Sequence, residues 1–515
     1  MTRVVETQYG KVAGIEDSGI SIFKGIPYAQ ALAGENLFMP PQPPKPWEGE
    51  LSADKFGATV PQVKTQGYFG DLCSPKYPAG DDCLNLNIYT PDTEAEGLPV
   101  FVWIHGGGYF MGCSSDEVYN GSSFAANGIV TVTINYRLGA LGYMYLGDYF
   151  PDLKESDNLG HQDQIAALQW VRDNIQAFGG NPNNVTIGGE SAGGMAVATL
   201  MAIPEAKGLF RRAIPQSQAL PNSFSKEDAS KITALMMEKL ELKAGDTRAL
   251  KSLEIDRIVQ AQQELQDDML DPENVDKFDK YGIKRAAGLM AFLPVHGTDS
   301  LPLTPQVAID NGASKDVDVM VGYTKDESSL FLVDADSSFM NPEMAKNALQ
   351  LVLGDNAPSI FELYKSKYAD LDDLQFCIQT ETDKMFSAIA YLFAENQAKN
   401  NKNIWMYRFD WETPQMGGKL GAHHFLEVPF TFNRLDNWQA DSLIGECKPY
   451  DVAETIHNYW VSFIKTGDPN NEKCPEWPKY HGDGGQVMLL DTECKVRQWP
   501  LEKEIIEIWK NSVLM

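Results

Sequence analysis

The chain has 515 residues, of which 43% are hydrophobic and 22% charged, so it can bury a large core and has no compositional sign of disorder. Asp and Glu total 71 against 43 Lys and Arg, without any long basic run, which argues against binding to nucleic acid or to an anionic membrane surface. No stretch approaches the roughly 20 apolar residues that a membrane-spanning helix needs. The composition therefore predicts a folded, water-soluble protein.

The N-terminus and the cysteines bear on where the protein is found. The first residues, "MTRVVETQYGKVAG", lack the apolar core of a secretory signal. The 7 cysteines are an odd, scattered set without C-x-x-C or Cys/His metal spacing. These features predict reduced thiols in a cytoplasmic protein, and a processed secreted form is the alternative.

The order of predicted elements indicates an α/β fold. Residues 1–60 alternate short β-like runs with turn residues, which predicts a small antiparallel ribbon. Further along, short apolar runs separated by helical or loop segments predict a mainly parallel sheet covered by helices. These runs are "LPVFVWI", "IVTVTINY", "NVTIGG", "RRAIPQS", "DVMVGY" and "NIWMYRF". Two long stretches, at about 225–285 and 340–400, are predicted to be helical insertions that cap the sheet and border a substrate entrance.

A glycine-rich motif follows the first of these apolar runs. The sequence "FVWIHGGGYFMG" leads from an apolar strand into His105 and three glycines, Gly106 to Gly108. Successive glycines let backbone amides approach a ligand atom, and this form supplies half of the oxyanion hole in lipases and esterases. By itself the motif also fits a flexible turn or a phosphate-binding nest. His105 is predicted to support the loop rather than to transfer protons.

Ser191 is the candidate nucleophile. Gly189 to Gly193, "GESAG", fits G-x-S-x-G, which by the chain's own composition would occur by accident in about one chain in five. The β-branched run before it and the helix-favouring segment after it are the context that a nucleophile elbow requires. The alternative is a tight turn with an inert serine. If the elbow forms, the amides of Gly107, Gly108 and Ala192 could converge on one developing oxyanion.

A serine nucleophile needs a base, and the base needs an acidic partner. Asp326 and Glu327 follow the predicted strand "DVMVGY", at the sheet edge where open α/β sheets keep their sites, although either carboxylate could instead be solvated. Among the downstream histidines, the helical pattern around His457 and the Gly-rich loop at His481 favour structural or exposed roles. The residues alone leave three histidines eligible as the base: His296, His423 and His424.

At these motifs the sequence resembles the type-B carboxylesterases, a family that includes the cholinesterases, and the resemblance extends through nearly the whole chain. "FGG" at 178–180, four further residues and "VTIGGESAG" at 185–193 match the family's serine signature, and "DDCLNLNIYTP" at 81–91 matches a second signature. The resemblance implies one α/β-hydrolase domain over residues 1–515, with helical insertions at about 225–285 and 340–400.

Carried over residue by residue, the resemblance implies roles for individual side chains. Ser191 is implied as the nucleophile and Glu327, rather than Asp326, as the acid. The family pattern H-x-x-E-(aliphatic)-P-(aromatic) fits when it starts at His424, which is therefore implied as the base, and His296 is interpreted as a structural variant. The implied oxyanion donors are the amides of Gly107, Gly108 and Ala192.

Departures from the family pattern refine these expectations. Val60 stands where secreted relatives carry the cysteine that pairs with the equivalent of Cys83, so that disulfide is expected to be absent. Cys73 stands where cholinesterases place a tryptophan for cation–π contact, which argues against choline esters as substrates.

The expected protein is a serine hydrolase that cleaves small to medium carboxylic esters through an acyl-enzyme, without a metal or an organic cofactor. A small-molecule ester is the expected partner, without nucleic acid or a membrane anchor, and the oligomeric state is undetermined. Tyr109 is expected to border the substrate pocket. Two alternatives stay open: a non-catalytic adhesion or scaffold protein, and an amidase, peptidase or true lipase with the same catalytic groups.

Overall fold

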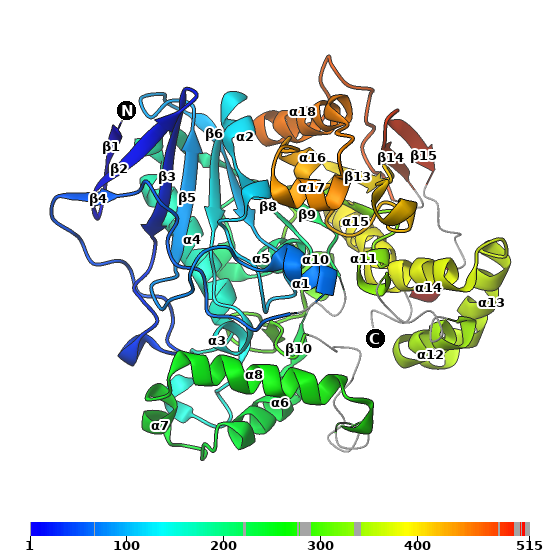
Figure 1. Cartoon of the computed structure of the whole chain (residues 1–515), viewed down its shortest axis with the longest axis horizontal. Coiled ribbons are helices and arrows are strands. Elements are labelled where there is room, and N and C mark those ends of the chain that lie inside the picture. Colours follow the sequence, from blue (N-terminus) through cyan, green and yellow to red (C-terminus); the bar gives the residue numbers. More distant parts are fainter. Residues whose placement is uncertain are drawn as a thin grey trace.

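A computed structural model describes most of the chain, and one large sheet runs through it (Figure 1). The described residues are 2–65, 67–219, 223–274, 278, 290–333, 341–482, 485–498, 505 and 507–509. Over these residues the strand order is β1-β2-β3-β5-β7-β6-β8-β9-β12-β13-β14-β15, with β4 paired to β2. A separate parallel pair joins β10 (Phe224–Ser225) to β11 (Val295–His296).

The centre of the sheet is parallel, as the apolar runs predict. All six predicted strands are present: β6 (Leu98–Ile104), β7 (Val130–Ile134), β8 (Gly180–Glu190), β9 (Arg212–Gln216), β12 (Asp318–Thr324) and β13 (Ile404–Phe409). Each pairs in parallel with its neighbours in the sheet order from β7 to β13. The predicted α/β fold class is confirmed.

The outer strands differ in direction from the centre. The predicted N-terminal ribbon consists of β1 (Thr2–Thr7), β2 (Gly10–Asp17) and β3 (Ile20–Pro27), which pair antiparallel, while the short β4 (Glu50–Ser52) runs parallel to β2. At the other edge β14 (Gln486–Leu490) adds in parallel to β13, and β15 (Lys495–Gln498) turns back antiparallel.

The strand β5 (Asn85–Thr90) was not predicted from apolar pattern, because it carries two asparagines. Both are buried and hydrogen-bonded: the Asn85 amide donates to the Ala58 carbonyl at 2.9 Å, and Asn87 accepts from the Gly25 amide at 2.9 Å. Paired polar groups are tolerated inside a sheet, so hydropathy alone misses such a strand.

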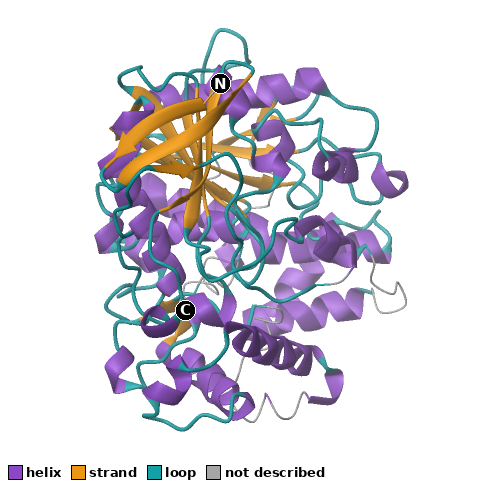
Figure 2. Cartoon of the chain, turned by 60° about the vertical axis from the view of Figure 1, so that its left-hand side comes forward, coloured by secondary structure: helices purple, strands orange, loops and turns teal. Residues whose placement is uncertain are grey.

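Helices cover both faces of the sheet (Figure 2). Alternate side chains of β6 belong to two different cores: Val100 and Val102 pack in the one that contains α4 and α5, whereas Phe101 and Trp103 pack in the one that contains α2 and α18. This alternation is the expected period of a strand that is buried on both faces. The helices of these layers are α2 (Ser122–Ala126), α3 (Gly139–Tyr143), α4 (Leu159–Asn174), α5 (Ala192–Leu200), α10 (Pro305–Asp310), α15 (Ala388–Asn400) and α18 (Tyr450–Thr466).

The two stretches predicted to be insertions are helical where they are described. The first holds α6 (Lys226–Lys239), α7 (Thr247–Lys251) and α8 (Ile255–Leu270); most of its remainder, 275–277 and 279–289, lies outside the described residues. The second holds α12 (Pro342–Leu353), α13 (Ala357–Lys367), α14 (Asp373–Thr382) and the π-helical turn η9 (Asp383–Ser387). The two groups lie apart, at the bottom and the lower right of Figure 1.

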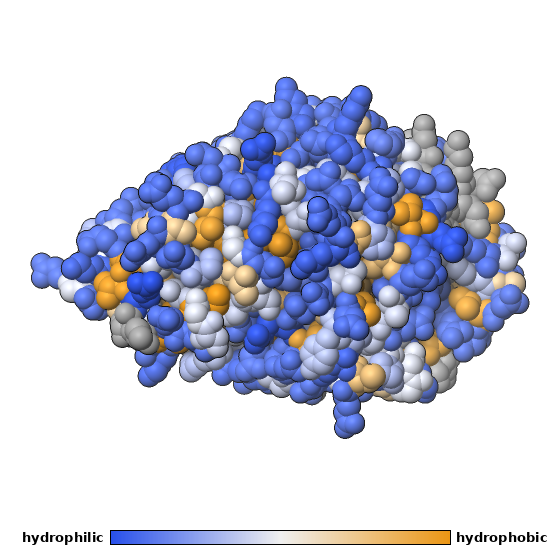
Figure 3. Space-filling view, turned by 90° about the horizontal axis from the view of Figure 1, so that it is seen from above, coloured by the Kyte–Doolittle hydropathy of each residue, from blue (hydrophilic) through white to orange (hydrophobic). Residues whose placement is uncertain are grey.

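Short helices α1 (Gly67–Cys73), α11 (Ser329–Leu332), α16 (Val428–Thr431) and α17 (Trp438–Ile444) complete the described elements that border the site. The face of the molecule seen in Figure 3 is mainly hydrophilic, with apolar residues in small separated spots. Scattered apolar residues are normal on protein surfaces, so this face presents no evident docking patch.

Candidate active site

Ser191 lies in the sharp turn between β8 and α5. Its backbone has φ +57° and ψ −124°, a conformation that is costly for a residue with a side chain. The flanking glycines leave no room for larger residues, because a Cβ on Gly193 would lie 2.1 Å from the Ile104 carbonyl oxygen and one on Gly189 would lie 2.6 Å from the backbone of Gly193. The turn therefore has the geometry predicted for a nucleophile elbow.

His424 and Glu327 meet at the carboxyl end of the sheet. Glu327 follows β12, and its Oε2 lies 2.5 Å from His424 Nδ1. Its other oxygen, Oε1, accepts a hydrogen bond from the Thr324 amide at 2.8 Å, which fixes the carboxylate. Both side chains are buried. Because a carboxylate can only accept, Nδ1 carries the proton of this contact and Nε2 is left for chemistry.

The neighbouring carboxylate Asp326 points away from the imidazole. Its Oδ1 accepts from Gln379 Nε2 at 2.8 Å and its Oδ2 from the Ala422 amide at 2.9 Å. The Asp326 amide in turn donates to the Ala422 carbonyl at 2.9 Å. Asp326 therefore ties the Glu327 turn to the His424 loop, while Glu327 makes the contact with the histidine.

The other candidate histidines lie in separate environments. His423 is buried, with Nδ1 2.6 Å from the His424 carbonyl oxygen, and burial lowers its pKa to about 4. His296 is half-buried with Nδ1 3.0 Å from Ser223 Oγ, in the small β10–β11 pair. His457 lies inside α18 with Nδ1 2.7 Å from the Thr431 carbonyl oxygen, and His481 is an exposed loop residue. Of these histidines, only His424 contacts a carboxylate through both ring nitrogens.

The second carboxylate on His424 belongs to Glu190, which the sequence did not indicate. Glu190 Oε1 lies 3.1 Å from His424 Nε2, and both side chains are buried. Burial, and next the negative charge of Glu327, raise the pKa of Glu190 well above its usual range. Glu190 is the variable residue of G-x-S-x-G, so the motif carries no signal for it. The Glu190 carboxyl therefore lies beside the ring nitrogen of His424 that Glu327 leaves unoccupied.

Ser191, His424, Gly106 and Gly107 line one cavity of about 20 Å³, which has room for about one water. The Ser191 hydroxyl makes no hydrogen bond with any residue that the structure describes. Ser191 and His424 thus border a common space. The remaining lining residues are Leu72, Cys73, Gly112, Asp116, Tyr119, Glu190, Phe425 and Gln439.

The three amides expected to form the oxyanion hole are unpaired. Gly107 and Gly108 have φ of +97° and +59°, and Ala192 is the first residue of α5, where an N–H has no partner within the helix. None of the three donates to any residue in the described part of the chain. His105 supports this loop: it is buried, stacks on the Tyr136 ring at 4.6 Å, and burial lowers its pKa to about 4.

Tyr109 is fully buried, with its ring 4.9 Å from that of Tyr143 and 5.8 Å from that of His161. It does not line the cavity beside Ser191 among the residues described. A ring that does contact His424 comes from the second insertion: the ring centroid of Phe386, in η9, lies 4.9 Å from that of His424. A substrate contact by Tyr109 stays a prediction.

The carboxyl of Asp116, on the wall of the same cavity, gives a pH prediction. Burial raises its pKa from 3.8 to about 7, and the Cys113 thiol donates to it at 3.2 Å. A raised folded-state pKa contributes stability that is present below pH 4 and lost as the pH rises through 7. Asp116→Asn should therefore gain stability relative to the wild type between pH 4 and 8, by about 2 kcal/mol with allowance for solvent at the cavity.

Chemical denaturation of both proteins across that pH range measures this difference. The exposed Asp152 supplies the matched control, because Asp152→Asn makes the same exchange of a carboxyl for an amide at the surface, outside the cavity. A stability difference for Asp116→Asn that does not change with pH would contradict the assignment.

The α/β-hydrolases are the class of proteins that carry a serine on a strand-turn-helix elbow, with a histidine and a carboxylate at the carboxyl end of a parallel sheet. The arrangement of Ser191, His424 and Glu327 defines this protein as one of that class. The model of the carboxylesterase family matches residues 1–509, and the chain belongs to that family. It is 37% identical over 507 residues to a para-nitrobenzyl esterase of Bacillus subtilis (strain 168), covering 97% of this chain and 96% of that one. It is 31% identical to a phenmedipham hydrolase of Pseudarthrobacter oxydans, over 95% of each chain.

The fold agrees with these relatives. A solved para-nitrobenzyl (PNB) esterase structure superposes with a TM-score of 0.85 at 35% identity and covers 99% of both chains. The protein is therefore a carboxylic ester hydrolase with the α/β-hydrolase fold, and its substrate is a small-molecule ester.

Further features bear on the setting of the site. All 7 cysteines are free thiols, so Cys83 forms no disulfide, as the valine at position 60 predicts. No helix within the described ranges is long and apolar enough to cross a membrane. The same described residues contain no cluster of three or more His, Cys, Asp or Glu side chains suited to hold a metal ion.

Proposed function

We propose that Ser191, His424 and Glu327 form the catalytic triad of this esterase and that the amides of Gly107, Gly108 and Ala192 form its oxyanion hole. The observation that carries the proposal is the 2.5 Å contact of Glu327 with His424 Nδ1, with His424 and the strained Ser191 bordering one cavity. The unpaired amides beside that cavity support the oxyanion assignment.

The reaction then proceeds in two halves. His424 Nε2 takes the proton of the Ser191 hydroxyl while Oγ bonds to the ester carbonyl carbon, and Glu327 stabilises the imidazolium. The three amides hold the negative oxygen of the tetrahedral intermediate. The alcohol leaves with the proton from His424, and an acyl-enzyme remains. Water, deprotonated by His424, attacks that acyl group, and the acid leaves while Ser191 regains its proton.

Small to medium esters are the proposed substrates. Para-nitrobenzyl esters are the first to try, because the Bacillus subtilis relative is named a para-nitrobenzyl esterase. A panel of p-nitrophenyl esters of increasing acyl length, a para-nitrobenzyl ester, an anilide and a choline ester tests this through kcat/KM. An active-site phosphonate, followed by mass spectrometry of the Ser191 peptide, tests the nucleophile. Absence of both ester hydrolysis and labelling would overturn the proposal, and a higher kcat/KM for the anilide would favour an amidase.

We also propose that residues 1–515 form a single domain whose insertions, at about 225–285 and 340–400, belong to it, and that the protein is cytoplasmic. The free thiols support the second point, since reducing compartments keep cysteines unpaired. Cell fractionation with an antibody to the chain tests the location, and limited proteolysis tests the domain. Release of a stably folded fragment would contradict a single domain.

The oxyanion assignment gives a prediction at Gly107. A Cβ there would lie 2.2 Å from the Met111 carbonyl oxygen and would need φ +97°, so Gly107→Ala must shift the loop. Loss of one oxyanion donor typically lowers kcat by about 10²- to 10³-fold, and we expect that loss here. Steady-state kinetics on a p-nitrophenyl ester measures it.

Gly97 provides the control for backbone strain alone. It has φ +81° with nothing within 4 Å of an added Cβ. Gly97→Ala should lose about 1 kcal/mol of stability and keep its kcat. Equal kcat values for Gly107→Ala and Gly97→Ala would show that the Gly107 loop is not part of the oxyanion hole.

A further inference from the structure

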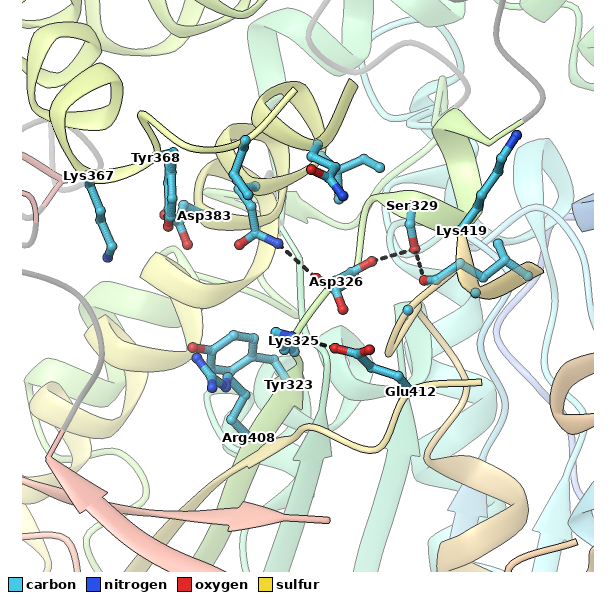
Figure 4. Close-up of a pocket in the computed structure, with 17 residues that line it drawn as sticks. Tyr323, Lys325, Asp326, Ser329, Lys367, Tyr368, Asp383, Arg408, Glu412 and Lys419 are labelled. Carbon is cyan, nitrogen blue, oxygen red and sulfur yellow. Dashed lines mark hydrogen bonds and ion pairs between the residues drawn. The ribbon is translucent and has the colours of Figure 1, made fainter. Parts of the chain in front are cut away.

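The turn that carries Glu327 is hydrogen-bonded on both sides to α14, a helix of the second insertion. Before Glu327, Asp326 Oδ1 accepts a hydrogen bond from Gln379 Nε2 at 2.8 Å, drawn as a dashed line in the middle of Figure 4. After Glu327, the Ser328 amide donates to Thr382 Oγ1 at 3.1 Å. The proposed acid of the triad therefore lies between two residues that bond to the same helix.

The two bonding side chains lie on one face of α14. Gln379 and Thr382 are three residues apart, which is the spacing of neighbours along a helix surface. The helix begins with a capping box, in which the Asp372 side chain accepts from the Gln375 amide at 2.8 Å. Reciprocal capping stabilises the first turn of a helix, so α14 is a defined support for the turn that carries Glu327.

The same turn is bonded to the loop that carries His424. Asp326 forms reciprocal bonds with Ala422, through its Oδ2 and its amide, at 2.9 Å each. Ser329 Oγ donates to the Leu420 carbonyl at 2.6 Å (Figure 4). Because His424 follows Ala422 by two residues, a displacement of Asp326 must act on the loop of the base as well as on the acid.

The contacts with α14 lie outside the cavity beside Ser191. Gln379 and Asp326 both line a separate cavity of about 400 Å³, and the contact of Thr382 with Ser328 is buried. A single hydrogen bond contributes modestly to stability, whereas misplacing a catalytic group by about 1 Å can lower the rate by about 10²-fold. The two bonds should therefore matter more for the geometry of the triad than for the stability of the fold.

We propose that Gln379 and Thr382 are positioning residues, which hold the turn at 326–328 so that the Glu327 carboxylate meets His424 Nδ1. The second insertion is thereby part of the catalytic apparatus, although neither Gln379 nor Thr382 lines the cavity beside Ser191. This inference rests on the proposed triad. Both residues act through Glu327 and not on the substrate.

Removal of the two bonds tests the proposal. Gln379→Ala and Thr382→Val remove one bond each, and valine has nearly the shape of threonine without its hydroxyl. Each variant should have a lower kcat, and the double variant should lose about 10- to 100-fold. KM should stay within about threefold, as expected when the binding of the substrate itself is unchanged. Steady-state kinetics on a p-nitrophenyl ester, well below each melting temperature, measures both constants.

Matched controls come from the same insertion. Thr380 is buried in α14 and donates within the helix, to the Phe376 and Cys377 carbonyls at 3.0 and 3.1 Å, so Thr380→Val should keep its kcat. Gln350 is exposed on α12, so Gln350→Ala should also keep its kcat. Thr382→Ser retains the hydroxyl and should recover most of the kcat that Thr382→Val loses.

A lower melting temperature without a lower kcat, in both Gln379→Ala and Thr382→Val, would overturn the proposal. It would show that the bond of Glu327 Oε1 with the Thr324 amide is enough to fix the carboxylate. An equal loss of kcat in Thr380→Val would also overturn it, because the effect would then come from the helix as a whole.

The rate at which a phosphonate labels Ser191 separates this proposal from the triad itself. Labelling also requires attack by the serine, so it should be slower in the double variant by the factor seen in kcat. Equal labelling rates in the wild type and the double variant would count against the positioning roles alone. A wild-type enzyme that is active but not labelled at Ser191 would overturn the triad, and this proposal with it.

Discussion

Ser191→Ala should lower kcat by about 10⁴- to 10⁶-fold while the protein keeps its fold, because the variant has no nucleophile but leaves every packing contact of the elbow in place. Residual turnover should come from the oxyanion amides and from substrate binding. Single-turnover kinetics with a p-nitrophenyl ester measures the loss. Near-normal turnover would exclude Ser191 as the nucleophile.

Ser191→Gly separates catalysis from backbone strain. At φ +57° and ψ −124° alanine carries the same strain as serine, whereas glycine does not. Relief of about 1–3 kcal/mol of strain, less the extra chain entropy of glycine, should leave Ser191→Gly about 1 kcal/mol more stable than Ser191→Ala. Both variants should be inactive. Urea denaturation midpoints measure the difference, and a less stable glycine variant would show that the elbow is not strained.

Much of the fold could be predicted because apolar pattern reports burial directly. The runs that form β6 and β12 are buried on both faces, and their hydropathy shows it. Asn85 and Asn87 in β5 are buried polar side chains with hydrogen-bond partners. The apolar pattern does not predict this strand, because its buried residues are accommodated by hydrogen bonds and not by being apolar. The strand β14, which lies between β13 and the edge strand β15, was also not predicted.

How far the sequence predicts the site differs from one residue to the next. Ser191 is set by local constraints, since Gly189 and Gly193 are required by backbone contacts that a motif can express. The partners of His424 come from elements about 100 and 230 residues earlier in the sequence, and only the fold brings them together. The chemistry of the residues alone left three histidines eligible as the base. The positions of Glu427 and Pro429 in the family pattern were needed to choose His424 among them. The contact of Glu190 with His424 has no local sequence signal at all.

The second large effect on kcat is expected at the adjacent histidines, His423 and His424. His424→Ala should lower kcat by about 10⁴- to 10⁶-fold, because it removes the imidazole that lies between Glu327 and Glu190. The same change leaves two buried carboxyls without the imidazole between them, so stability should also fall. His424→Gln fills the space with a neutral amide and should be as inactive but more stable.

His423→Ala should retain kcat within about tenfold and lose about 1–3 kcal/mol of stability. Its Nδ1 lies 2.6 Å from the His424 carbonyl oxygen and its ring is buried, but among the described residues it does not line the cavity beside Ser191. His423→Asn keeps a donor near that carbonyl and should recover part of the stability. Kinetics and denaturation of the four variants measure both effects. An inactive His423→Ala beside an active His424→Ala would move the base by one residue, and it would require Glu327 to reach an imidazole that the fold directs away from it.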